Sequence, residues 1–324
     1  MNKEQQLENV LCIGLDIAWF GGSANDKDSQ YDCLSYVLIS PDKEPVFDLL
    51  RIPLVDRDLD STCLLAAFDE LLESHRGQNR ILFALDAPIQ AVDRGLPLRN
   101  SVPSKGSVQR RACENHLDNK RKELEKSTRG NDGWRPNIQP GAPLAPRVNS
   151  LLNGLQERGF SLWTDGDKNA EKLVVECFPS EAIWAIKQMG HYPDSATATC
   201  VKAYKKQKGI LLSNEQVTRL VRDVLDSFVS ASGNPYLWPI LVDQTINWML
   251  NERTWHKNGG YKGGKLLDDV VDTMICLATS LSYAYDQAHV WQDPEQPDDG
   301  HIIGPGFSNN GVWAPASIGD GGDI

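Results

Sequence analysis

The stretch VLCIGLD, residues 10–16, constrains the fold more than any other part of the sequence. Its first six residues are apolar or small, which is typical of a strand in the middle of a sheet. The run ends at Asp16, which has no obvious helix directly after it to cap. A buried strand that ends in an acid indicates a carboxylate at the edge of a sheet, where ligands of open α/β sheets bind.

The apolar runs that follow predict the neighbours of this strand. Residues 31–40 and 46–54 predict two further strands with only a few residues between them. Such a short connection favours antiparallel pairing, so the first three strands are expected to form a meander. A helix capped by Ser61 and a strand at residues 80–85 are expected next.

The rest of the chain is expected to be mainly helical. A strand is predicted at residues 173–175, with a weaker one near 160–163. Helices are predicted at residues 147–158, 215–230, 238–253 and 266–287, the last apolar on most of its circumference and hence buried. Three antiparallel strands, a helix, a parallel strand, a helical insertion, another strand and a closing helix follow the order of the ribonuclease H-like α/β fold, a mixed sheet flanked by helices.

The domain organisation follows from where this order is interrupted. Residues from about 89 to 145 are rich in Pro, Gly, Arg and Lys, and they are interpreted as a helical, basic insertion. The interpretation is a single domain over residues 1–288 that carries this insertion. Residues 289–324 are rich in Gly, Pro and Asp and are expected to form a loosely attached C-terminal tail.

Composition excludes several classes of protein. With 324 residues, 40% of them hydrophobic, the chain is neither disordered nor fibrous. Its seven cysteines are scattered without a Cys-x-x-Cys spacing, which predicts reduced thiols in a cytoplasmic protein. A polar N-terminus and the lack of an apolar run of about 18 residues predict neither a signal peptide nor a membrane span.

Four places where an acid interrupts an apolar run predict a metal site. Asp16, Asp86 and Glu176 each end a predicted strand, while Asp269 and Asp272 share one face of the last helix. Clustered carboxylates repel each other, and a divalent cation removes that cost. Ligands that are all oxygen suit Mg²⁺ or Mn²⁺, and two such ions about 3.5–4 Å apart serve phosphoryl transfer.

Three of these acids also have a plainer interpretation, whereas Asp16 has no obvious helix to cap. Asp86 precedes Ala87 and Pro88, so it also fits a turn. Glu176 and Asp269 lie near helix starts, where the helix dipole favours negative charge whatever the function.

Short motifs around these acids resemble one family. GLDIAW (14–19), LDAP (85–88), VECFPS (175–180) and DDVVDT (268–273) are similar, in this order, to the family called domain of unknown function 429. Its members are commonly described as predicted ribonuclease H-like nucleases, so the resemblance implies that fold and nuclease activity. Asp269 and Asp272 also resemble the closing-helix acids of RuvC-type resolvases.

The insertion is the most basic part of this acidic chain. Between residues 99 and 129 there are nine basic and four acidic residues, a net charge of +5 in a protein of net charge −11. Such a segment beside an acidic cleft suits contact with a phosphate backbone, although a solvated helix of mixed charge has the same composition. The candidate nucleic-acid contacts are Arg110, Arg111, Lys120, Arg121 and Trp19.

The sequence thus predicts a divalent-metal-dependent nuclease. Asp16 would bridge the metals, Asp86 and Asp272 would complete their shells, and Asp269 and Glu176 would be auxiliary ligands or outer acids. One alternative is a catalytically silent module of the same fold that binds nucleic acid or protein. A less favoured alternative is an actin-like ATPase or sugar kinase, which would need a second copy of the unit and glycine-rich phosphate loops.

Overall fold

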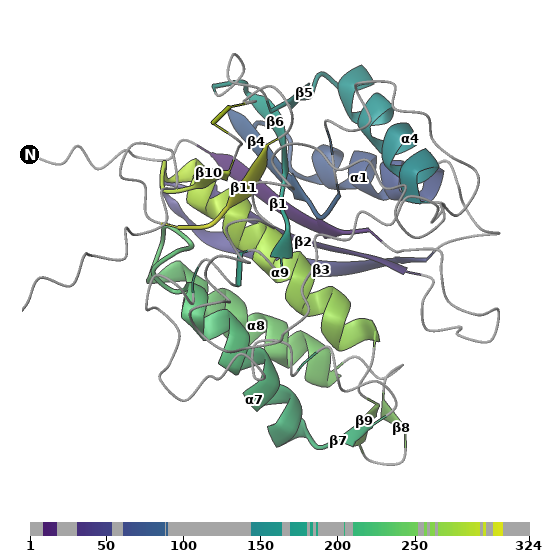
Figure 1. Cartoon of the computed structure of the whole chain (residues 1–324), viewed down its shortest axis with the longest axis vertical. Helices are drawn as coiled ribbons and strands as arrows, with labels where there is room; N and C mark the ends of the chain where they lie inside the picture. The colour runs from purple at the N-terminus through teal and green to yellow at the C-terminus, as the bar shows by residue number, and fades with distance from the viewer. Residues whose placement is uncertain are drawn as a thin grey trace, which may run out of the picture.

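The computed structural model of the chain describes residues 9–17, 31–53, 61–87, 89, 144–163, 169–179, 182–183, 186, 204, 210–251, 256–257, 260–262, 265–291, 294–295 and 301–306. These residues form a mixed α/β fold in which helices cover both faces of a central sheet (Figure 1).

Six strands form the central sheet in the order β3-β2-β1-β4-β6-β5. They are β1 (Val10–Asp16), β2 (Tyr31–Ser40), β3 (Lys43–Pro53), β4 (Arg80–Leu85), β5 (Ser161–Leu162) and β6 (Lys172–Glu176). The first three pair antiparallel, and β4, β6 and β5 run parallel to β1. The predicted meander followed by parallel strands is therefore confirmed, and β2 and β4 have the predicted bounds.

Two helices, α1 (Thr62–Ser74) and α4 (Leu144–Glu157), pack together on one face of the sheet. Phe68 of α1 lies against Phe83 of β4 and against Phe160, with ring centroids 5.4 and 5.5 Å apart. An ion pair of 2.6 Å joins Asp69 of α1 to Arg158, which directly follows α4. The aromatic contacts fix α1 to the sheet, and the ion pair fixes the end of α4 to α1.

The long helix α9 (Lys265–Ala284) covers the other face and crosses β1, β2 and β4 (Figure 1). Gly14 of β1 allows this close approach, because a Cβ atom there would lie 2.3 Å from both the Leu277 nitrogen and the Thr273 carbonyl oxygen. Two hydroxyls of α9 hold the contact: Thr273 Oγ1 donates to the Gly14 carbonyl at 2.9 Å, and Ser280 Oγ donates to the Ile13 carbonyl at 2.6 Å. The position of α9 along β1 is thus fixed by backbone contact.

Two further helices, α7 (Asn214–Leu225) and α8 (Leu237–Asn251), lie beside each other, and α7 packs against α9 (Figure 1). α7 begins with a capping box in which Ser213 Oγ accepts from the Gln216 amide and the Gln216 side chain accepts from the Ser213 amide. A short 3₁₀ helix, η3 (Asp226–Phe228), ends α7. No helix in the described part of the chain is both long and apolar enough to cross a membrane.

A small sheet lies next to the start of α9. Its order is β7-β9-β8, and its strands are β7 (Leu211–Leu212), β8 (His256–Lys257) and β9 (Gly260–Lys262). β9 pairs antiparallel with both neighbours, and it ends three residues before α9 begins. This sheet therefore joins the start of α7 to the start of α9.

The hairpin of β10 (His289–Trp291) and β11 (Ile302–Gly304) differs from the expectation of a loose tail beyond residue 288. Ile303 forms a parallel bridge with Cys177, directly after β6, and it is 1% exposed. The ring of His301 meets that of Trp163 edge-on, with centroids 4.6 Å apart. Burial of these side chains attaches the hairpin to the domain, whereas residues 307–324 lie outside the described residues.

Ser61 begins α1 as predicted but does not cap it through its side chain. Its backbone is left-handed, with φ at 56°, and its hydroxyl donates instead to the Arg147 carbonyl at 2.7 Å. Arg147 is fully buried, and its guanidinium makes two hydrogen bonds to the equally buried Asp32 carboxylate, at 2.5 and 3.1 Å. The start of α1, the start of α4 and strand β2 are thus joined by buried polar contacts.

The buried imidazole of His289, at the start of β10, should make the protein less stable in acid. It is 8% exposed, and neither ring nitrogen has a hydrogen-bond partner among the described residues. Burial lowers its pKa from 6.5 to about 4, so between these values the unfolded chain binds a proton that the folded chain does not. The free energy of unfolding should therefore fall by about 1–2 kcal/mol as the pH drops from 7.5 to 5.

Urea denaturation of the wild type and of a His289→Gln variant at both pH values tests this expectation. The variant should lose less stability between pH 7.5 and 5 than the wild type, because Gln has no proton to bind. Equal losses would show that His289 is not the group responsible.

Candidate acidic site

The ends of the parallel strands lie in register. Leu15 of β1 pairs with Leu85 of β4, which pairs with Glu176 of β6. The hydrogen-bond ladder continues one residue beyond the strands, because the Asp86 amide donates to the Leu15 carbonyl at 3.0 Å and the Cys177 amide donates to the Leu85 carbonyl at 2.9 Å. The predicted strand-end acids thus come from neighbouring strands at one edge of the sheet.

Alternation along the strands assigns these residues to faces. Gly14 faces α9, as its contact with the helix backbone shows. Because side chains alternate along a strand, Asp16 lies on the same face as Gly14, and in register with it lie Asp86 and Cys177. The Cys177 sulfur indeed lies 3.1 Å from Thr279 Oγ1 of α9. Two of the predicted acids therefore face α9.

α9 directs its own acids to the same edge. Asp269, Asp272 and Cys276 follow one another at spacings of three and four residues, and so lie along one stripe of the helix. Burial raises the pKa of the Cys276 thiol, a hydrogen bond with Cys177 raises it further, and so do the charges of Asp86 and Asp16. The stripe therefore runs past the two strand-end aspartates.

We call these four aspartates (Asp16, Asp86, Asp269 and Asp272) the acidic edge. Three of them are buried, with 5%, 6% and 5% exposure for Asp16, Asp269 and Asp272, and Asp86 is half-buried. Several negative groups at one buried edge raise the electrostatic cost of each, and a bound cation would offset that cost.

Glu176 lies apart from the acidic edge. By the same alternation it projects from the opposite face, in register with Leu15 and Leu85. Its Oε2 accepts a hydrogen bond from the Ile89 amide at 3.0 Å, which fixes the backbone just after Asp86. This placement suits an outer role for Glu176, in which it positions the turn that carries Asp86.

Tyr204 belongs to the site and was missed by sequence reasoning. Its hydroxyl donates to Oδ1 of Asp272 at 2.8 Å, and the residue is 1% exposed. In the sequence it is surrounded by Lys202, Lys205 and Lys206, a pattern that favours a solvated segment. Only the three-dimensional structure brings it to Asp272, 68 residues further along the chain.

The potential metal ligands of the acidic edge are all carboxylate oxygens, the type of ligand that suits Mg²⁺ or Mn²⁺. Within the described ranges, however, no three His, Cys, Asp or Glu side chains converge closely enough to hold a metal ion. The acids thus share an edge without forming a closed coordination shell. The divalent metal therefore stays a prediction from the sequence.

The candidate nucleic-acid contacts lie outside the described residues. This applies to Trp19 and to the four basic residues of the insertion, Arg110, Arg111, Lys120 and Arg121. Their part in binding remains a prediction from the sequence.

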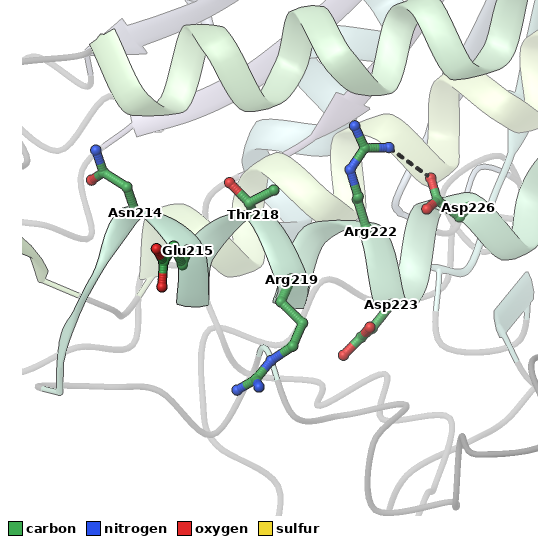
Figure 2. A pocket seen from close by; sticks show the side chains of 7 residues that line it. All are labelled: Asn214, Glu215, Thr218, Arg219, Arg222, Asp223 and Asp226. Carbon is green, nitrogen blue, oxygen red and sulfur yellow. Dashed lines mark ion pairs between the residues drawn. The ribbon is translucent and has the colours of Figure 1, made fainter.

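A shallow depression along α7 is distinct from the acidic edge. Figure 2 shows its lining, which consists of Asn214, Glu215, Thr218, Arg219, Arg222, Asp223 and Asp226. Arg222 pairs with Asp226 at 3.6 Å and with Asp243 of α8. Burial raises the pKa of Asp226, and the charge of Arg222 opposes this effect. The paired charges have a structural role in joining α7 to α8, and we assign no ligand to this depression.

Comparison of the chain with family models, with curated proteins and with solved structures finds no match. The resemblance to the domain of unknown function 429 family therefore stays a prediction.

Proposed function

We propose that the protein is a divalent-metal-dependent hydrolase of phosphodiester bonds, built on a ribonuclease H-like fold. One observation carries the proposal: the in-register ends of β1 and β4 bring Asp16 and Asp86 to the face where α9 presents Asp269 and Asp272. The strand order β3-β2-β1-β4-β6 and the closing helix α9 agree with the order expected for that fold.

Each acid has a role that follows from its position. Asp16 lies on the central strand between β2 and β4, so it is the best placed to be shared between two ions. Asp86 on one side and Asp272 on the helix would complete the shells, with Asp269 as an auxiliary ligand. Bound Mg²⁺ or Mn²⁺ would activate a water and stabilise the leaving oxygen. Glu176 would act indirectly, through the Ile89 amide.

Nucleic acid is the proposed substrate because of the charge distribution of the chain. The whole chain carries a net charge of −11, which repels phosphate backbones, so contact requires a local basic surface. The basic insertion follows β4 directly in the sequence and leaves the sheet just beyond Asp86. Because the insertion begins just after Asp86, its basic residues would be close to the acidic edge.

A binding module without catalysis is the second candidate. It is favoured by the finding that no three potential ligands converge on one point in the described part of the chain. Such a module would bind nucleic acid in a salt-sensitive manner and would not cleave it in Mn²⁺.

Metal binding is the first property to test. Titration calorimetry with Mn²⁺, with and without an oligonucleotide, should show at least tenfold weaker binding by Asp16→Asn than by the wild type, because the shared ligand loses its charge. Asp243→Asn is the matched control, since it makes the same change on α8, where Asp243 pairs with Arg222. Circular dichroism and thermal unfolding should show that both variants are folded.

Cleavage then separates the two candidate functions. Wild-type protein should cleave at least one of single-stranded DNA, RNA, a hybrid or a junction in Mn²⁺, and Asp16→Asn should not. Equal Mn²⁺ binding by the wild type and Asp16→Asn would refute the metal site. Tight binding of an oligonucleotide without cleavage would favour the binding module.

A further inference from the structure

A buried tyrosine holds one oxygen of an acidic-edge carboxylate. The Tyr204 hydroxyl donates to Oδ1 of Asp272 at 2.8 Å, and the two residues are 1% and 5% exposed. A hydrogen bond between a hydroxyl and an ionised carboxylate is among the stronger ones, particularly where water is excluded. The bond therefore restricts the rotation of the Asp272 side chain.

Such a restriction matters for a residue that presents a ligand atom. A free aspartate side chain loses rotational freedom when it binds a metal, and a prior hydrogen bond removes part of that entropy cost. In metal sites generally, partners that hydrogen-bond the ligating carboxylates raise metal affinity.

A plain structural role is the competing explanation, because a buried tyrosine hydroxyl generally finds a partner. The position of its partner, Asp272, favours a role at the acidic edge in addition to a structural one. Asp272 is one turn before Cys276, and that thiol is in electrostatic contact with both Asp16 and Asp86. Tyr283, at the far end of α9, shows the plain case, because its hydroxyl accepts from the neutral Trp163 indole at 2.8 Å.

We propose that Tyr204 is a positioning residue that orients the Asp272 carboxylate for a divalent cation at the acidic edge. This inference rests on the proposed function and deepens it. Tyr204 lies between β6 and β7 in the sequence, so the inference adds a residue from outside the strands and α9 to the proposed metal site. In this role Tyr204 would act through Asp272 and would not itself be a ligand of the metal.

A double-mutant cycle with Mn²⁺ as the probe tests the inference. Titration calorimetry compares the wild type, Tyr204→Phe, Asp272→Asn and the double variant. Tyr204→Phe should weaken Mn²⁺ binding about tenfold. In the Asp272→Asn background the same change should have almost no effect, because Tyr204 acts through Asp272.

Tyr283→Phe is the matched control, since it also removes one hydroxyl that bonds within the fold near α9. Its Mn²⁺ affinity should equal that of the wild type, even if both Phe variants unfold at a lower temperature without metal. This comparison separates positioning from general stability. If Tyr204 had only a structural role, Tyr204→Phe and Tyr283→Phe should have the same Mn²⁺ affinity.

The possible outcomes separate this inference from the proposed function. If Asp16→Asn weakens Mn²⁺ binding and Tyr204→Phe does not, the inference is wrong and the metal site stands. Equal weakening by Tyr204→Phe with Asp272 intact and with Asp272→Asn would also overturn it. Should the wild type bind no Mn²⁺, or bind it as well as Asp16→Asn does, the proposed function fails and this inference fails with it.

Discussion

Replacing Gly14 by alanine should lower the free energy of unfolding by about 3 kcal/mol or more. The added Cβ atom would lie 2.3 Å from two backbone atoms of α9, the Leu277 nitrogen and the Thr273 carbonyl oxygen. A backbone cannot rotate away as a side chain can, so the helix itself must move from the strand. Overpacking in cores typically costs about 1–3 kcal/mol, and a clash with backbone on a buried helix belongs at the upper end.

The same change should also weaken metal binding. α9 carries Asp269 and Asp272, so moving the helix away from β1 separates them from Asp16 and Asp86. The Thr273 hydroxyl would lose its 2.9 Å bond to the Gly14 carbonyl as well. Mn²⁺ affinity, measured on the folded fraction at low temperature, should therefore fall together with stability.

Gly304→Ala is the control for this prediction. Gly304 lies in β11, and a Cβ atom placed there would meet nothing within 4 Å. Chemical denaturation should give this variant nearly the stability of the wild type. If Gly14→Ala and Gly304→Ala were equally stable, the close contact between α9 and β1 would be refuted.

Breaking the buried pair of Arg147 and Asp32 should have the largest effect on stability. Both side chains are 0% exposed, and two hydrogen bonds join them. Asp32→Leu would leave the guanidinium buried without its carboxylate, and such a loss costs about 3–5 kcal/mol. Arg147→Met would likewise leave the Asp32 carboxylate buried without its guanidinium, and it should lower the free energy of unfolding by a similar amount.

The double variant with Leu at Asp32 and Met at Arg147 should recover most of that loss. Replacing both members of a buried pair by apolar groups of similar volume is often close to neutral. Asp69→Ala gives the exposed counterpart, since the Asp69 carboxylate is 51% exposed and pairs with Arg158; its loss should cost less than about 1 kcal/mol. Urea denaturation of all four variants tests the pattern, and equal costs for Asp32→Leu and Asp69→Ala would contradict it.

The strands were the most predictable part of the fold. The apolar runs at β2 and β4 gave their bounds because both strands are buried in the middle of the sheet, where burial alone determines the pattern. Ser61 shows where local rules fail: it stands before a helix, but its hydroxyl bonds to Arg147, 86 residues away. The β10–β11 hairpin was missed because its strands have three residues each and lie on either side of a Pro- and Asp-rich stretch.

The candidate site was predictable in part. Asp16 and Asp86 could be placed together, because both end strands and the parallel pairing brings such ends to one edge. Glu176 also ends a strand, but its face depends on register, and one residue of shift reverses the face. Tyr204 could not be found, since its partner Asp272 is 68 residues away and its lysine-rich neighbours indicate an exposed segment.

The polar contacts on both sides of the basic insertion have a consequence for how this protein could diversify. Ile89, at its start, is held by Glu176, and Arg147, just after its end, is held by Asp32. Both anchors are made to strands of the central sheet, to β6 in the first case and to β2 in the second. We therefore expect the sheet to tolerate changes in the length and sequence of the chain between these anchors, so that a binding surface could evolve there, or be grafted by an engineer, separately from the acids at the strand ends.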